Sequence, residues 1–261
     1  KNWSQFLRLL NEDRVNLAEE SLCRLLEVDT LENKTFLDIG SGSGLYSLAA
    51  RRLGAKVHSF DYDPQSVSCT TELKSRYFPE DGDWVIESGD ALDQKYLKNL
   101  GKFDVVYSWG VLHHTGDMWN ALHNASEMVQ QNGFFYVSIY NDQGGPSRRI
   151  LRIKKIYNLI PNGFKWIIWM PMLIKLWWRN TLRDLIKDGK LFSTWKNYAQ
   201  VEARGMSAFT DLIDWVGGLP FEVAKPEEIF DFFAERNFVL KRLKTCGGGI
   251  GCNEFVFKKL S

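Results

Sequence analysis

The sequence predicts an α/β fold built on a doubly wound, mostly parallel sheet of seven strands. Over residues 35–140, five strand-like segments alternate with helical ones, and strands joined by helices form a parallel sheet. Two further strand-like segments, 238–245 and 254–258, are connected by residues 246–252. Because that Gly-rich connection is too short for a crossover helix, the last pair is predicted to be antiparallel.

Hydrophobic periodicity places the individual elements. Apolar residues at helical spacing predict one or two helices within residues 3–27, ahead of the sheet. The five parallel strands are predicted at 35–39, 56–60, 84–87, 103–107 and 133–140. The helices are predicted at 45–53, 65–76, 92–100, 117–131 and 226–236. Residues 142–225 interrupt this alternation, so we expect a Rossmann-like domain of residues 1–141 and 226–261 with a helical cap insertion between strands 5 and 6.

Composition narrows the class of protein. The chain has 261 residues and a net charge of +1, which argues against whole-chain electrostatic attraction to nucleic acid or membrane. The four cysteines and four histidines show no metal-ligand spacing, so no metal site is expected. Free thiols are favoured, with a Cys246–Cys252 disulfide as the alternative. Without a signal peptide in the sequence, we expect a cytoplasmic protein, with peripheral membrane contact left open.

A glycine-rich turn follows the first strand of the sheet. Its Gly40-Ser-Gly-Ser-Gly44 pattern differs from the Gly-x-Gly-x-x-Gly of dinucleotide sites, which would require glycine at position 45, where leucine stands. Glycines let the backbone approach a ligand, and amides at a helix N-terminus favour a carboxylate. The turn therefore predicts a cofactor site other than a dinucleotide pyrophosphate site.

Acidic residues follow the second and third strands. Asp61 ends the second strand, where its carboxylate can accept both hydroxyls of a ribose, while Asp63 before Pro64 suits a helix cap. Tyr62 is then expected beside an adenine plane. Asp90, in Gly89-Asp90-Ala91, can accept from an adenine amino group, with a helix cap as the alternative role.

Four motifs occur in this order: FLDIGSGSGLYSLAARRLGAKVHSFDYDP, ESGDAL, FDVVYSWGVLHHTGD and CNEFVF. Together they resemble class I S-adenosylmethionine (SAM)-dependent methyltransferases, in particular the branch of ubiquinone-biosynthesis and natural-product sugar O-methyltransferases. The resemblance covers residues 35–141 and 226–258. It implies SAM as the cofactor, with its methionine end at Asp38 and the glycines, its ribose at Asp61 and its adenine at Asp90. The implied cofactor site comprises Asp38, Gly40, Ser41, Gly42, Gly44, Asp61, Tyr62, Asp90, Ala91 and Trp109.

Two adjacent histidines follow the fourth strand, at the sheet edge where ligands of open α/β sheets bind. An imidazole, with a pKa of about 6.5, is a suitable base for deprotonating an acceptor hydroxyl. Related sugar O-methyltransferases carry a similar histidine here, and the resemblance implies that His113 or His114 serves this role. Since adjacent side chains point in different directions, one of them is expected to act. We favour His114; structural roles for both remain the alternative.

Further acceptor contacts are predicted at the same edge. Tyr140 and Asn141 close the fifth strand, although a polar loop also explains them. Gly248 and Gly249 lie in the loop between the last two strands, where successive amides can bind an anion or simply form a hairpin. Arg204, where the insertion returns toward the sheet, completes the predicted substrate-binding set.

Basic charge is concentrated in the insertion. Residues 143–204 contain thirteen Lys and Arg but only three Asp and Glu, a net charge of +10. Within them, residues 164–178 mix tryptophan and lysine, are too short to span a bilayer and contain Pro171. Three interpretations follow: a cap over the acceptor pocket, an interfacial helix contacting a membrane surface, and a homodimer surface.

The sequence therefore predicts a SAM-dependent methyltransferase, with a hydroxyl of a sugar, glycan precursor or specialised metabolite as acceptor. The basic insertion would also suit an anionic acceptor. Nucleic acid is not favoured as a partner, because the Asn/Asp-Pro-Pro-Tyr/Phe motif of many amino-nitrogen methyltransferases is replaced by Ser108-Trp-Gly-Val111. The alternatives are an RNA or protein methyltransferase using the basic insertion and an enzyme acting on a membrane-bound lipid.

Overall fold

The structure is a computed structural model that describes residues 6–7, 10–201, 208–249 and 251–261. The described residues form two compact units. One comprises Asn11–Gln143 and Pro220–Ser261, and the other comprises Gly144–Leu219 with the described part of residues 1–10. The first unit contains the sheet and the second is helical, so each is described separately.

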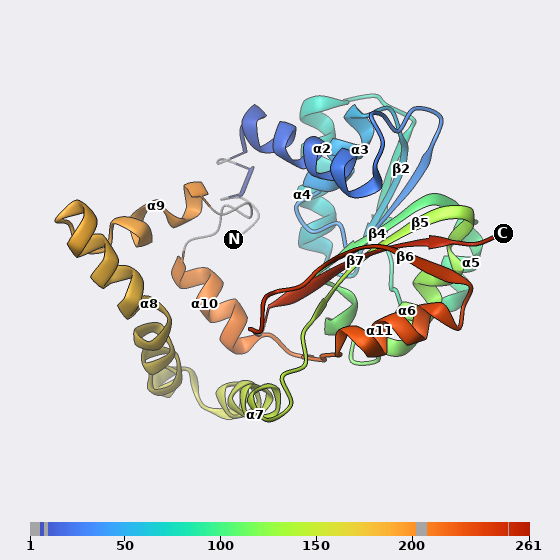
Figure 1. Ribbon diagram of the computed structural model, residues 1–261. Helices are drawn as coiled ribbons and strands as arrows, with labels where there is room; N and C mark the ends of the chain where they lie inside the picture. Colours follow the sequence, from blue (N-terminus) through green and yellow to red (C-terminus); the bar gives the residue numbers. More distant parts are fainter. Residues whose placement is uncertain (1–5, 8–9, 202–207, 250) are drawn as a thin grey trace. The chain divides into compact units, whose positions relative to one another are not determined.

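The sheet of the first unit has seven strands in the order β3-β2-β1-β4-β5-β7-β6 (Figure 1). The strands are β1 (Thr35–Ile39), β2 (Lys56–Asp61), β3 (Trp84–Ser88), β4 (Phe103–Trp109), β5 (Val129–Tyr140), β6 (Phe238–Lys244) and β7 (Cys252–Lys259). Strands β1 to β5 pair in parallel, and β7 is antiparallel to both β5 and β6. This arrangement confirms the predicted doubly wound sheet with one terminal hairpin.

Helices cover both faces of this sheet (Figure 1). They are α2 (Glu12–Leu26), α3 (Leu45–Arg52), α4 (Pro64–Tyr77), α5 (Gln94–Leu100), the 3-10 helix η1 (Leu112–His114), α6 (Met118–Glu127) and α11 (Pro226–Ala234). Apolar side chains of α5, α6 and α11 pack with alternate sheet residues into one buried core. Because neighbouring strands are parallel, their carboxyl ends meet at a single edge, where the connecting loops place the candidate site.

The predicted helix over 117–131 was wrong at its C-terminal end. Helix α6 ends at Glu127, and β5 already begins at Val129, four residues before the predicted strand. The backbone amide of Phe103 donates to the Met128 carbonyl, so the chain turns to pair with β4 there. A register shift opposite Phe103 and Val105 accommodates the polar residues that follow Val129. Gln130 and Gln131, which suit a helix by propensity, therefore form the irregular start of β5.

The second unit consists of helices. They are α7 (Gly145–Leu159), the short η2 (Asn162–Phe164), α8 (Trp166–Asp188), α9 (Ser193–Val201) and α10 (Ala208–Gly217). Their shared core is formed by Tyr157, Leu212 and Val216, against which one face of α8 packs. Across the described residues, no helix combines the length and apolar character that a membrane span requires. The four cysteines of the chain are free thiols.

Candidate functional site

The glycine-rich turn leaves the carboxyl end of β1 and leads directly into α3. Gly40, Gly42 and Gly44 all have positive φ angles, between 55° and 77°, which L side chains rarely adopt. A Cβ atom on Gly40 would collide with the side chain of Val111, in the loop after β4. A Cβ on Gly44 would contact Thr70 of α4. Glycine is therefore required here by the packing of the protein itself, and this packing fixes the path of the turn.

Asp61 connects the end of β2 to this turn. One carboxylate oxygen accepts from the Gly42 amide at 2.9 Å and the other accepts from the Asp63 amide at 2.9 Å. Burial raises the pKa of the Asp61 carboxyl. A carboxylate offers about four acceptor positions, so two bonds to the backbone leave capacity for two ligand hydroxyls. The neighbouring Asp63 caps α4 by accepting from Gln65, which confirms the capping role predicted for Asp63, whereas the ribose contact of Asp61 stays a prediction.

Asp38 lies beneath the turn, on β1. It is 2% exposed and accepts a hydrogen bond from the Ser47 hydroxyl of α3. Ser47 in turn accepts from Ser59, and Ser59 accepts from the indole nitrogen of Trp84. Burial, with the nearby charge of Asp61, raises the pKa of the Asp38 carboxyl to about 7. A chain of hydroxyl donors therefore orients a carboxyl group whose charge changes near neutral pH.

The loop after β3 lies beside Asp61, because the Gly89 amide donates to the Asp61 carbonyl at 3.1 Å. Asp90 accepts from the Leu92 amide, whereas the cap of α5 is Asp93. The side chain of Tyr62 is 80% exposed. Of the other predicted cofactor residues, Ser41 and Ala91 are buried and Trp109 ends β4, half-buried. Their contact with a cofactor stays a prediction.

The two histidines occupy different environments. His113 is fully buried, with its ring 4.2 Å from the ring of Tyr140. His114 is partly exposed, and its Nδ1 lies 2.6 Å from the Pro220 carbonyl oxygen. Because a carbonyl only accepts, this hydrogen bond requires a proton on Nδ1, and in the neutral ring the basic lone pair is then on Nε2.

The segment that holds the histidine loop, residues 220–224, carries no motif that indicates this role in the sequence. Residues 220–224 connect the loop after β4 to the carboxyl end of β5 by backbone hydrogen bonds. Glu222 donates its amide to the His113 carbonyl, and its carboxylate accepts from the amides of Gly116 and Met118. The Ala224 amide donates to Tyr140. Glu222 thereby satisfies amides at the N-terminus of α6, where the N-cap residue forms no side-chain bond.

Asn141 supports the glycine-rich loop between β6 and β7. Its side-chain amide donates to the Gly249 carbonyl at 3.2 Å, and its oxygen accepts from Asn253 at 3.1 Å. Asn141 is 7% exposed, so its polar atoms serve the loop, whereas Gly248 and Gly249 are exposed. Arg204 lies outside the described residues. The acceptor-contact roles predicted for these residues and for Tyr140 stay predictions.

These residues form one constellation within the first unit. Asp38, Asp61 and the glycine turn lie toward the carboxyl ends of β1 and β2. The His114 imidazole, oriented by its hydrogen bond to Pro220, follows β4. The set offers acceptors for hydroxyl and ammonium groups, backbone amides at a helix N-terminus and a base. It fits a ligand that carries a ribose and an amino acid group.

Comparison with known proteins agrees with this chemistry. Residues 37–135, which contain the glycine turn, Asp61 and both histidines, match the family described as "Methyltransferase domain". The ubiquinone biosynthesis O-methyltransferase of Xanthomonas axonopodis pv. citri is 27% identical over 175 residues, which cover 64% of this chain and 70% of that protein.

Solved structures share the fold. The magnesium protoporphyrin IX methyltransferase of Synechocystis PCC 6803, with bound S-adenosylhomocysteine (SAH), superposes with a TM-score of 0.55 at 13% identity, covering 98% of this chain and 93% of that chain. An O-methyltransferase family protein from Burkholderia thailandensis gives a TM-score of 0.55 at 12% identity, covering 95% and 57%. With the sheet order, the glycine turn and the family match, the chain is a class I SAM-dependent methyltransferase related to O-methyltransferases.

Proposed function

We propose that the chain transfers a methyl group from SAM to a hydroxyl of a small molecule, namely a sugar, a glycan precursor or a specialised metabolite, with His114 as general base. The observation that carries this proposal is the bond between His114 Nδ1 and the Pro220 carbonyl. It orients the imidazole and assigns the basic lone pair to Nε2.

The residues of the first unit suit the cofactor. SAM, when bound, supplies an electrophilic methyl group on a sulfonium. Asp61 would accept the ribose hydroxyls with the acceptor positions that its backbone bonds leave. Asp38 would hold the methionine ammonium group through an ionised carboxylate. The amides of the glycine turn, at the N-terminus of α3, would favour the methionine carboxylate.

The transfer requires little covalent chemistry from the protein. Bound SAM would supply the methyl group and retain the electron pair of the carbon–sulfur bond as SAH, and Nε2 of His114 would take the proton that the acceptor hydroxyl loses. Positioned proton transfer of this kind contributes about a hundredfold to ten-thousandfold in rate. Glu222, by holding the amides of the loop that carries His114, would keep the imidazole in place.

A hydroxyl acceptor is favoured by the site and by the named relative. An imidazole base is needed where the acceptor must lose a proton during transfer, as a hydroxyl does. The Xanthomonas relative is named an O-methyltransferase. The basic insertion suits an anionic acceptor such as a glycan precursor, and it is also the feature that an RNA methyltransferase would use, so the experiment separates acceptor classes.

The test is transfer of a labelled methyl group from SAM to separated pools of nucleotide sugars and glycans, lipids, RNA and protein. Wild type, His114→Ala and Asp61→Asn are compared, with His123→Ala of α6 as the matched histidine control. We expect label in the sugar or metabolite pool, lost in Asp61→Asn and reduced at least about tenfold in His114→Ala.

Other outcomes correct the proposal at defined points. Label in RNA or protein would overturn the acceptor class and support the alternative use of the basic insertion. Label in the lipid pool would support a membrane-bound acceptor instead. Full activity of His114→Ala would overturn the base assignment while leaving the acceptor class intact.

A further inference from the structure

Helix α8 has two apolar faces with different environments. Its inner face, formed by Ile168, Trp169, Met172 and Leu173, packs against the core of the second unit. A second set of apolar residues follows the opposite face at helical spacing: Trp166, Ile167, Met170, Ile174 and Trp178. The helix therefore carries more apolar surface than the packing of its own unit uses.

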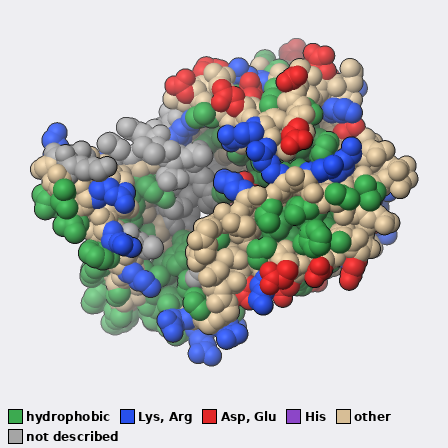
Figure 2. Space-filling view, viewed as in Figure 1, with side chains coloured by type: hydrophobic (Ala, Val, Ile, Leu, Met, Phe, Trp, Pro, Cys, Tyr) green, Lys and Arg blue, Asp and Glu red, His purple; other side chains and the backbone are tan. Residues whose placement is uncertain are grey.

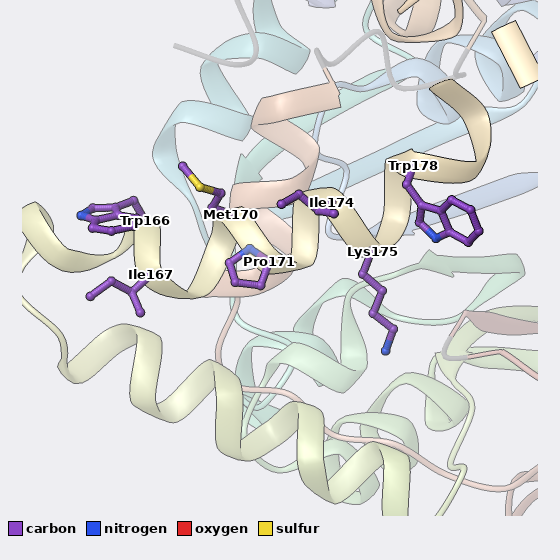
Figure 3. Close-up of a pocket in the computed structure, with 7 residues that line it drawn as sticks. All are labelled: Trp166, Ile167, Met170, Pro171, Ile174, Lys175 and Trp178. Carbon is purple, nitrogen blue, oxygen red and sulfur yellow. The ribbon is translucent and has the colours of Figure 1, made fainter. Parts of the chain in front are cut away.

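The outer face is exposed to solvent. Trp166 is 49%, Ile174 61% and Trp178 55% exposed, and Leu182 and Leu185 extend the stripe toward the end of the helix. Figure 3 shows Trp166, Ile174 and Trp178 projecting from one helix, with Lys175 beside them. Together with Ile167, Met170 and Pro171, these four side chains line a shallow depression. Contiguous apolar surface of this kind marks an interaction site.

A row of basic side chains borders the apolar stripe. Lys175, Arg179 and Arg183 are spaced four residues apart, and all three are exposed. Among the described residues, none of these three forms an ion pair. Figure 2 shows hydrophobic and basic side chains together over this helix. The stripe and the row give α8 the character of an interfacial helix.

One acidic side chain of α8, Asp184, is withdrawn from solvent. Asp184 is 4% exposed, and its carboxylate accepts from the amide and the hydroxyl of Thr194, at the start of α9. Residues 143–204 carry a net charge of +10, so the rest of the chain carries −9. The outer face of α8 therefore presents apolar and cationic groups within the most basic part of the protein.

We propose that the outer face of α8 binds the surface of an anionic lipid bilayer. The helix lies in the plane of the interface, with Ile174 and its apolar neighbours among the acyl chains and the two tryptophans at headgroup level. Lys175, Arg179 and Arg183 contact lipid phosphates. A symmetric contact with a second copy is disfavoured, since it would press two such basic faces together.

This inference goes beyond the proposed function and is independent of it. Lipid binding requires α8 of the second unit, whereas SAM binding requires Asp38 and Asp61 of the first. The surface would hold the enzyme at a membrane whether its acceptor is lipid-linked or dissolved beside it.

The test is co-sedimentation of the full chain with vesicles of phosphatidylcholine alone and of phosphatidylcholine mixed with phosphatidylglycerol, at low and high salt. One variant combines Ile174→Gln with Trp178→Gln, and another combines Lys175→Gln with Arg179→Gln. Leu17→Gln of α2 is the matched control, because Leu17 is a helical apolar residue that is 63% exposed. SAH binding by calorimetry shows that the first unit of each variant is folded, and circular dichroism shows that the helices of the second unit are kept.

We expect the wild type and Leu17→Gln to sediment with anionic vesicles and not with neutral ones. Each α8 variant should bind at least about tenfold more weakly while keeping its SAH affinity, and high salt should weaken wild-type binding. Absence of wild-type binding, or unchanged binding of the α8 variants, would overturn the proposal. So would concentration-dependent self-association that the variants abolish without vesicle binding, since the stripe would then cover a second copy.

Discussion

The Nδ1 atom of His114 lies 2.6 Å from the carbonyl oxygen of Pro220, although the two residues are 106 positions apart in the sequence. The bond joins the loop after β4 to the segment that leads back into the sheet. It gives Pro220 a role that its turn-forming character does not suggest, because its carbonyl selects the tautomer of the histidine proposed as base.

Glu222 is predicted to stabilise the loop that carries this histidine. Glu222→Ala removes the acceptor for two amides at the start of α6, so the free energy of unfolding should fall by about 1–2 kcal/mol and methyl transfer should slow. Glu222→Gln, which keeps one acceptor oxygen, should lose less. Chemical denaturation measures the change. Glu227→Ala is the control, because its exposed ion pair with Lys225 contributes little; an equal loss there would refute a specific role for Glu222.

Gly40 is predicted to be required for two separable reasons. Its φ angle is positive, and a Cβ atom at this position would collide with the side chain of Val111. Gly40→Ala should lower both stability and SAH affinity. Adding Val111→Ala should restore part of the loss, leaving about 1–2 kcal/mol of left-handed backbone strain. Gly189→Ala is the matched control, since Gly189 is in the left-handed region, with a φ of 63°, but has no atom within 4 Å of its would-be Cβ. If Val111→Ala gives no recovery, the steric explanation is incorrect.

The raised pKa of Asp38 predicts a specific pH dependence of stability. Between the ordinary value of 3.8 and about 7, the folded cofactor-free protein holds a proton that the unfolded chain releases. Stability should therefore fall as pH rises through this window, relative to Asp38→Asn, by up to about 1.4 kcal/mol per pH unit. Thermal unfolding of both proteins from pH 5 to about pH 7.5 measures the difference. Parallel curves would show that Asp38 titrates normally.

Lys154 predicts the opposite slope at alkaline pH. It is 1% exposed, donates to the Trp215 carbonyl, and burial lowers its pKa from 10.5 to about 8. Between these values the unfolded chain binds the additional proton, so stability should rise with pH relative to Lys154→Met. Denaturation at several alkaline pH values tests this. The exposed neighbour Lys155 provides the control, since Lys155→Met should follow the wild type; a Lys154→Met curve with the wild-type slope would contradict the account.

The sheet and the cofactor turn could be predicted from the sequence because their signals are local. Strand β1 and the glycines after it form one continuous pattern, and the capping role of Asp63 follows from its position before Pro64. The start of β5 could not be predicted, because the contact that ends α6 is made by Phe103, far earlier in the chain.

Roles that depend on distant partners were also hidden. Nothing beside Asn141 indicates that it bonds to Gly249 and Asn253, so its position at a strand end suggested an acceptor contact. Trp169 and Trp178 look equivalent in the sequence of α8, yet Trp169 packs against Phe209 and Trp178 is 55% exposed. Periodicity shows that a helix is apolar, but which face is covered depends on residues elsewhere.

The most direct test of the central claim is the single-turnover rate of methyl transfer by His114→Ala, measured together with its SAH affinity. We predict a rate at least about tenfold below wild type with unchanged SAH affinity, and a larger remaining rate at high pH, where the acceptor hydroxyl loses its proton without help. His123→Ala should match the wild type in both. A His114→Ala enzyme that transfers methyl groups at the wild-type rate would contradict the assignment of His114 as the base.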